Sequence, residues 1–283
     1  MPFVLRRATE TTSPGDLELA RAHGAIALPR NGSIAWDAFD AREHDPATLR
    51  VAAEVWSARA AQEYHSLALF TQLSSQVHLL GAPLDWSGAF ARIIGDEVRH
   101  TELCVRMAET LDSSASVSIE PDTLALPMTQ TSLRAHVRAV ILATFCIGET
   151  VSGRTFRRCL RAATVPLARD VVRTICDDET FHGRFGWEAG ALLMRPDAPD
   201  FAHERAAFAR QLPELFAYYR DACGAARGRA WAAAGPESDL APNFGTLTEA
   251  GYARAFFEGM DEDIVPGLVA IGFSEAEAAW AAI

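Results

Sequence analysis

Two copies of one short pattern, Asp-Glu-x-x-His, hold the residues best suited to chemistry in this sequence. They run from Asp96 to His100 and from Asp178 to His182. On a helix, side chains three positions apart lie on one face, so each copy would present a glutamate beside a histidine. Carboxylate oxygens and imidazole nitrogens together suit iron or manganese. The repeated pattern therefore predicts a metal site with two similar halves.

Two lone glutamates, Glu63 and Glu149, extend the candidate set. Each interrupts an apolar stripe on the helix expected just before one of the patterns. Four unpaired carboxylates in a core would be very costly, whereas two divalent cations would balance their charges. We therefore expect six residues to bind metal and to form the catalytic centre: Glu63, Glu97, His100, Glu149, Glu179 and His182. Because Glu-x-x-His also occurs by chance, the alternatives are a buried salt-bridge network and a degenerate, metal-free bundle.

Four long helices are needed to position these residues, and a 3.6-residue apolar period predicts them. The first covers about 46–80 and the second ends near Leu111, with the helix-stopping sequence Gly81-Ala82-Pro83 between them. The third covers roughly 131–162 and the fourth ends near Met194. Each pair of helices is joined by a short turn, which predicts two helical hairpins.

The segment between the two hairpins, residues 112–130, is rich in Ser, Pro and Thr and is not periodic, so we expect a long crossover. Two hairpins joined in this way have ferritin-like connectivity. The predicted fold class is all-α: a ferritin-like four-helix bundle with extra C-terminal helices. We expect an irregular wrapping segment over 1–45 (with 25–36 either a hairpin or irregular), the bundle over 46–195, and a C-terminal helical extension packed on the bundle over 196–283, with helices near 200–232, 246–262 and 274–282.

The order of these ligands resembles the ferritin-like di-iron carboxylate superfamily, in particular its four-helix-bundle oxygenases and oxidases. Its members place Glu, Glu-x-x-His, Glu and Glu-x-x-His on four successive helices, and the resemblance covers about 46–195 of this chain. It implies two iron ions as cofactor, with a manganese–iron pair as the alternative. It also implies reaction with O2, an external electron donor and a small-molecule substrate. Dimers are common in the superfamily, so a homodimer is an expected assembly.

Two positions distinguish this chain from subgroups of that superfamily. Cys104 stands where ribonucleotide reductase small subunits have their radical tyrosine, which argues against radical generation. Ile175 stands where arylamine N-oxygenases have a third histidine. The chain has no Cys-x-x-Cys either, so the rubredoxin module of rubrerythrins is not predicted.

The aspartates of the two patterns have a role next to the metal ligands. A metal-bound imidazole usually donates its other N–H to a carboxylate or carbonyl. Because the second and fourth helices should be neighbours, we expect Asp96 to support His182 and Asp178 to support His100. The alternative is that either aspartate faces solvent or pairs with Arg99, Arg154 or Arg173.

Helical spacing also predicts residues for a substrate pocket. Leu67 and Cys146 lie one turn from the lone glutamates, and Cys104 lies one turn after His100. Apolar walls of this kind would suit an apolar or aromatic substrate and exclude water. Packing in an ordinary core is the alternative for the three.

The predicted function is that of a non-haem di-iron oxygenase or oxidase that uses O2 on a small organic substrate. The roughly 90 residues after the bundle favour it, because oxidation of iron alone needs no additional helices around a substrate. One alternative is a ferroxidase or peroxide-scavenging ferritin-like protein. The other is a metal-stabilised helical protein without enzymatic activity.

Composition narrows the partners and the compartment. The 26 basic and 37 acidic residues give a net charge of −11, which argues against nucleic acid and anionic membranes as partners. The five cysteines are odd in number and lack metal-binding spacing, which fits a reducing compartment. We see no signal peptide and no apolar run of membrane-spanning length, so a soluble, cytoplasmic protein is expected.

Overall fold

The computed structural model of the chain describes residues 1–5, 23, 25–27, 33–195 and 201–283. This part of the chain is mostly helical, which confirms the predicted all-α class; its strands are limited to two of two residues each. The chain divides into two compact units, each described separately below: unit 1 comprises Met1–Pro127 and Thr164–Ile175, and unit 2 comprises Met128–Ala163 and Cys176–Ile283.

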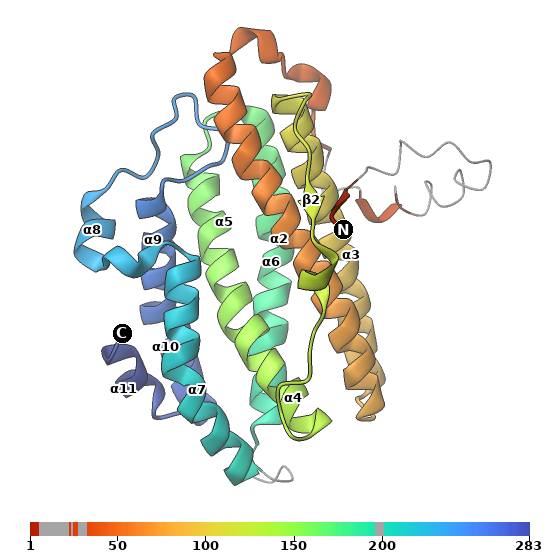
Figure 1. Cartoon of the computed structure of the whole chain (residues 1–283), viewed down its shortest axis with the longest axis vertical. Coiled ribbons are helices and arrows are strands. Elements are labelled where there is room, and N and C mark those ends of the chain that lie inside the picture. The colour runs from red at the N-terminus through yellow and green to blue at the C-terminus, as the bar shows by residue number, and fades with distance from the viewer. Residues whose placement is uncertain (6–22, 24, 28–32, 196–200) are drawn as a thin grey trace, which may run out of the picture. The chain divides into compact units, whose positions relative to one another are not determined.

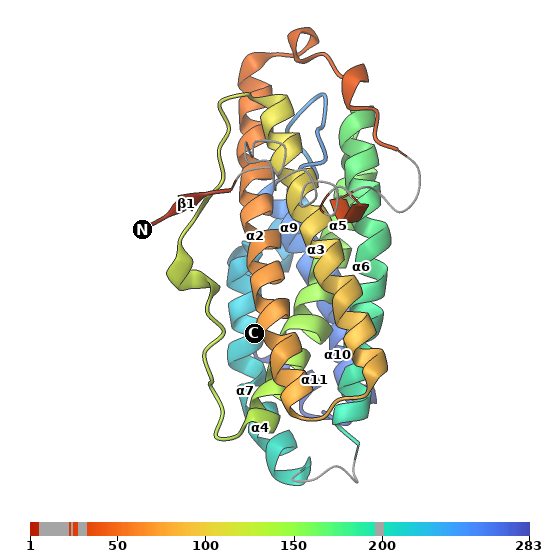
Figure 2. The ribbon, with the colours of Figure 1, turned by 90° about the vertical axis from the view of Figure 1, so that its right-hand side faces the viewer.

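Unit 1 is built around a hairpin of two long helices, α2 (Pro46–Leu79) and α3 (Leu84–Leu111), which lie side by side in Figure 2. α2 begins where predicted because the Asp45 side chain accepts a hydrogen bond from the Thr48 N–H. The chain then reverses at Gly81, whose φ of 74° is readily adopted only by glycine. Both helices therefore match the sequence expectation closely.

The other elements of unit 1 are short. β1 and β2 pair antiparallel, with Phe3 opposite Ile119. The crossover is mainly irregular as predicted, and α6 (Pro166–Leu193) begins in this unit and continues in unit 2. The short elements are β1 (Phe3–Val4), η2 (Trp36–Ala38), η3 (Ala41–Glu43), β2 (Ser118–Ile119) and η4 (Pro121–Leu124). The centre of the stretch expected to be a hairpin or irregular, residues 28–32, lies outside the described residues.

The third predicted helix forms over almost the expected range, but its middle is not an α-helix. α4 (Leu133–Val140) continues into η5 (Ile141–Glu149), a π-helical segment, and then into α5 (Thr150–Ala162). Figure 1 shows the three as one continuous helix. A π-helix has i→i+5 hydrogen bonds, is rare, and occurs mostly where function requires it. Apolar periodicity does not separate it from an α-helix, so the sequence did not predict it.

The C-terminal helices differ from the expected ranges at three glycine or proline positions. Gly224 and Gly228 have φ of 65° and 86°, and they end the helix expected over 200–232 at Ala222. The helix expected to end at 262 continues to Ala270, since a π-helical turn precedes Pro266, which has no N–H to donate. The elements are α7 (Phe201–Ala222), η6 (Ala225–Arg227), α8 (Arg229–Ala234), α9 (Glu249–Gly259), η7 (Met260–Ile264), α10 (Val265–Ala270) and α11 (Ala276–Ala281).

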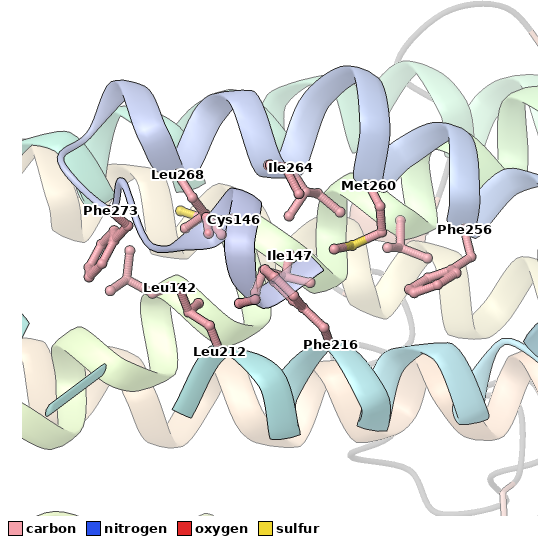
Figure 3. Close-up of a cluster of buried hydrophobic side chains, with 14 of the residues drawn as sticks. Leu142, Cys146, Ile147, Leu212, Phe216, Phe256, Met260, Ile264, Leu268 and Phe273 are labelled. Carbon is pink, nitrogen blue, oxygen red and sulfur yellow. The ribbon is translucent and has the colours of Figure 1, made fainter. Parts of the chain in front are cut away.

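The core of unit 2 joins the C-terminal helices to one face of η5. Figure 3 shows Leu142 and Ile147 of η5 near Leu212 and Phe216 of α7. Burial of each large apolar side chain contributes roughly 1.5–3 kcal/mol, so this cluster holds the C-terminal helices firmly on η5. The other residues labelled in that view are Cys146, Phe256, Met260, Ile264, Leu268 and Phe273.

One helix is long and apolar enough to be compared with a membrane span, which was not expected from the sequence. Residues 133–162 are long and apolar enough to cross a membrane by length and composition, with a mean hydropathy of 1.2 in the best window. Inside the protein, 61% of that window is buried. The core helix of a soluble protein passes the same test, so this is weak evidence for a membrane span.

Candidate metal centre

Three of the six predicted ligands come together in unit 1. Glu63 on α2 and Glu97 and His100 on α3 place their donor atoms within 4.8 Å of one another. All three are buried, and His100 Nδ1 lies 3.4 Å from Glu63 Oε2. The tight turn at Gly81 sets the register that brings the α2 glutamate level with the α3 pair. We call these residues the first triad.

The surroundings of the first triad include a buried cation that sequence reasoning missed. Arg59 lies one turn before Glu63, is 4% exposed, and its guanidinium lies 4.7 Å from the centre of the Trp56 ring. A basic residue at i−4 from a candidate ligand on the same helix face is the signal that would have found it. Arg59 therefore adds a positive charge to the negative charges of the glutamates that bound metal ions would have to offset.

Cys104 is buried close to the first triad. Burial raises the pKa of its thiol, and the negative charges of Glu63 and Glu97 add to this, while Arg59 opposes it. The thiol therefore stays protonated at neutral pH. The donor atoms that come together in the first triad are carboxylate oxygens and an imidazole nitrogen, and the Cys104 sulfur is not among them.

The other three predicted ligands come together in unit 2. Glu149 is the last residue of η5, and Glu179 and His182 lie on α6; their donor atoms are within 4.8 Å of one another. His182 Nδ1 lies 3.2 Å from Glu149 Oε2 and 3.9 Å from Glu179 Oε2. All three are buried. We call them the second triad.

Glycines on α6 allow η5 and α6 to approach closely enough for this contact. A Cβ at Gly186 would lie 2.7 Å from Phe145 Cβ, and one at Gly190 would lie 2.9 Å from the Cys146 sulfur. The Cys146 thiol also donates a hydrogen bond of 3.2 Å to the Gly186 carbonyl. A side chain at either glycine would push the helices apart, so these positions fix the second triad's geometry.

The same ring nitrogen faces the carboxylates in both triads. Nδ1 of His100 and of His182 lies against the lone glutamate of its triad. A metal ion between these donors would therefore bind Nδ1 and leave Nε2 for an acceptor outside the triad. This is the arrangement in which a supporting carboxylate has a purpose.

Asp96 and Asp178, the predicted supporting residues, are both buried. Asp96 accepts a hydrogen bond of 2.7 Å from Arg99, and Arg92 lies 3.6 Å from its other oxygen. Asp96 thus pairs with Arg99, which is the alternative to a contact with the histidine. The expected contacts of Asp96 with His182 and of Asp178 with His100 stay predictions.

The three predicted pocket residues have different surroundings. Cys104 and Cys146 are fully buried, and Leu67 is partly exposed. Cys146 packs in the apolar cluster of Figure 3, as expected for a residue of an ordinary core. A cavity of about 230 Å³ in unit 2 is lined by other residues, among them Leu142 and the partly buried ion pair Arg138–Glu204. A pocket lined by Leu67, Cys104 and Cys146 stays a prediction.

The donor set fits iron or manganese. Each triad offers two carboxylates and one imidazole, and no thiolate belongs to either. Hard oxygen donors with imidazole suit these metals, whereas zinc and copper(I) sites commonly use thiolates. An ion held by the three donor groups of one triad would keep open coordination positions.

No family model, curated protein or solved structure matches the chain. The functional argument therefore depends on the residues and geometry of the two triads.

Proposed function

We propose that this protein is a non-haem di-iron oxidoreductase that uses O2 to oxidise a small organic substrate. The observation that supports it most is the equivalence of the two triads. Each has one glutamate on one helix, a Glu-x-x-His pair on another, and a histidine Nδ1 within 3.4 Å of the lone glutamate. Two such half-sites in one chain are what a two-metal centre requires.

The proposal includes the fold around the centre. In it, α2, α3, the continuous α4–α5 helix and α6 belong to a ferritin-like four-helix bundle, and each triad binds one of two iron ions. The four glutamates offset the charge of two divalent ions, and Arg59 adds one positive charge near the first triad. Two bound ferrous ions would supply electrons for the reduction of O2, and an external donor would restore them.

The protein's own residues would bind and orient the ions and keep water away. The ligands are at most 7% exposed, so the carboxylates act in a medium of low dielectric constant, where their charges interact strongly. The C-terminal helices cover one face of η5, the segment that ends on Glu149. This covering favours oxidation of an organic molecule, because oxidation of ferrous ions alone needs access for ions and no enclosing helices.

The test begins with anaerobic loading of the full chain with ferrous iron. We expect two iron ions per chain and, after a pulse of O2, an optical and Mössbauer change that follows the amount of iron. Glu179→Ala should lose at least one ion, while Glu188→Ala, an exposed glutamate on the same helix, should bind iron like the wild type.

The outcomes separate the alternatives. Two bound ions that do not react with O2 would contradict the oxidoreductase and leave a metal-stabilised protein. Catalytic consumption of added ferrous iron with formation of ferric mineral would identify a ferroxidase instead. Full iron occupancy in Glu179→Ala would show that the ligand set is wrong.

A further inference from the structure

A tyrosine from the C-terminal helices contacts the π-helical segment directly. The Tyr219 hydroxyl on α7 donates a hydrogen bond of 2.8 Å to the carbonyl oxygen of Ala143 in η5. The same hydroxyl lies where a side chain at Gly148 would begin, since a Cβ there would be 2.9 Å away. The hydroxyl thus occupies a space on η5 that exists only because residue 148 is glycine.

These two contacts lie at the two ends of one π turn. Ala143 and Gly148 are five residues apart, which is the spacing of the i→i+5 hydrogen bond that defines a π-helix. A carbonyl oxygen has two lone pairs, so Ala143 can accept the tyrosine in addition to a backbone N–H. Tyr219 therefore connects to the turn that immediately precedes Glu149.

The charge environment agrees with this placement. Burial raises the pKa of Tyr219, and the nearby Tyr218 and Glu149 raise it further. The phenol therefore stays a protonated donor at neutral pH. The hydroxyl lies against Gly148, the residue directly before Glu149, which places the tyrosine near the second triad.

We propose that Tyr219 is a positioning residue for the metal centre. By holding the Ala143 carbonyl, it keeps η5 π-helical and so orients Glu149 toward His182. Helix α7 then takes part in metal binding without providing a ligand. This inference rests on the proposed function, since it assigns Glu149 to the centre.

The test compares two adjacent tyrosines. Tyr219→Phe removes only the hydroxyl, and Tyr218→Phe removes one from a residue that is 66% exposed. The full chain is titrated anaerobically with Co²⁺, whose visible absorption reports the ligands of each ion. In Tyr219→Phe we expect the affinity for one of the two ions to fall about tenfold, as for other residues that orient metal ligands. The absorption of that ion should change, while Tyr218→Phe matches the wild type.

A Glu63→Ala background assigns the affected ion, because it disrupts the first triad and leaves the second intact. The loss caused by Tyr219→Phe should persist there. A lower melting temperature with unchanged cobalt binding would mean that the hydroxyl only stabilises the fold, and would overturn the inference. A wild type that binds no cobalt would instead refute the proposed function, and this inference with it.

Gly148→Ala provides a second, independent measurement. In the wild type the new methyl group would meet the Tyr219 hydroxyl at 2.9 Å, whereas the ring carbon behind it is at an ordinary 3.6 Å. The substitution should therefore weaken cobalt binding more in the wild type than in Tyr219→Phe. Equal fold-changes in both backgrounds would show that the hydroxyl does not act on this turn.

Discussion

The two triads share one ligand pattern but are positioned in different ways. The first lies on a hairpin of two regular helices, α2 and α3, closed by a glycine turn. The second combines a glutamate at the end of a π-helical segment with a pair on α6, a helix that approaches through glycines. The geometry of the first triad follows from the local chain reversal at Gly81. The geometry of the second triad depends on the close packing of α6 against η5.

The surroundings differ in the same sense. Near the first triad, the buried Arg59 and Cys104 both come from the hairpin itself. At the second, Tyr219 contacts η5 from α7, and Trp187 donates a hydrogen bond of 3.2 Å to Thr150, the residue after Glu149. We conclude that the second triad should be the more sensitive of the two to changes far from it in the sequence.

The largest effect should come from Gly186→Ala. The new Cβ would lie 2.7 Å from Phe145 Cβ and 2.8 Å from its backbone carbon, and backbone cannot move aside as a flexible side chain can. We expect a loss of about 3 kcal/mol in the free energy of unfolding, the upper range for overpacking. The second triad should also lose its ion. Urea unfolding and cobalt titration measure the two effects.

Gly183→Ala on the same helix is the matched control. A Cβ at Gly183 would meet nothing within 4 Å, and alanine favours a helix over glycine by about 1 kcal/mol. This variant should therefore be as stable as the wild type or more so. If Gly186→Ala behaved in the same way, close packing would not be what positions the second triad.

A smaller effect, in the opposite unit, should follow from Arg59→Met. The charges of Arg59, Glu63 and Glu97 all act on the Cys104 thiol. Removal of the buried guanidinium takes the positive charge out of this group, so the metal-free protein should lose about 2 kcal/mol of stability. Without the positive charge of Arg59, a divalent ion would no longer be repelled. The affinity of the first triad for Co²⁺ should therefore rise on the order of tenfold.

Arg50→Met, an exposed position on the same helix, controls for the loss of a surface charge. It should change neither stability nor cobalt affinity measurably. Weaker cobalt binding in Arg59→Met would show that Arg59 orients the ligands of the first triad rather than repelling the ion. Cobalt binding at the second triad should stay unchanged in both variants.

Sequence reasoning was accurate where structure is local. The cap at Asp45 and the turn at Gly81 are encoded by adjacent residues, and both bounds of the α2–α3 hairpin were predicted closely. The grouping of the side chains within each triad follows from spacing and apolar phase, which are properties of single helices, while their role as metal ligands stays a prediction. The expected domain limits at 45 and 195 stay predictions.

What the sequence did not reveal depends on contacts between distant segments. Over the nine residues of η5, the apolar pattern of the sequence does not distinguish a π-helix from an α-helix. The role of Tyr219 requires knowing that α7 lies on η5, and the role of Gly186 requires knowing what α6 packs against. A substrate pocket is still harder to predict, since it depends on all of these contacts together.

The smallest predicted effect tests how the C-terminal helices are held on α5. Glu237 accepts hydrogen bonds of 2.7 Å from Arg158 on α5 and of 2.6 Å from Arg254 on α9. Burial works to raise the pKa of Glu237, but these two arginines outweigh it and lower that pKa below its ordinary 4.5. A carboxylate with a lowered folded-state pKa stabilises the fold above its unfolded pKa. That stabilisation is lost as the pH falls through the folded value.

Glu237→Gln should therefore lower the melting temperature at pH 7. The melting temperature of this variant should also fall less than that of the wild type as the pH decreases below 4.5. Since a third of the side chain is exposed, solvent screening limits the effect to about 1 kcal/mol or less. Glu277→Gln, an exposed glutamate on α11, should leave the melting temperature at pH 7 unchanged. If the C-terminal helices help to position the second triad, Glu237→Gln should also weaken cobalt binding there and not at the first triad. An equal loss at both triads would mean that the C-terminal helices stabilise the whole chain and give the second triad no particular support.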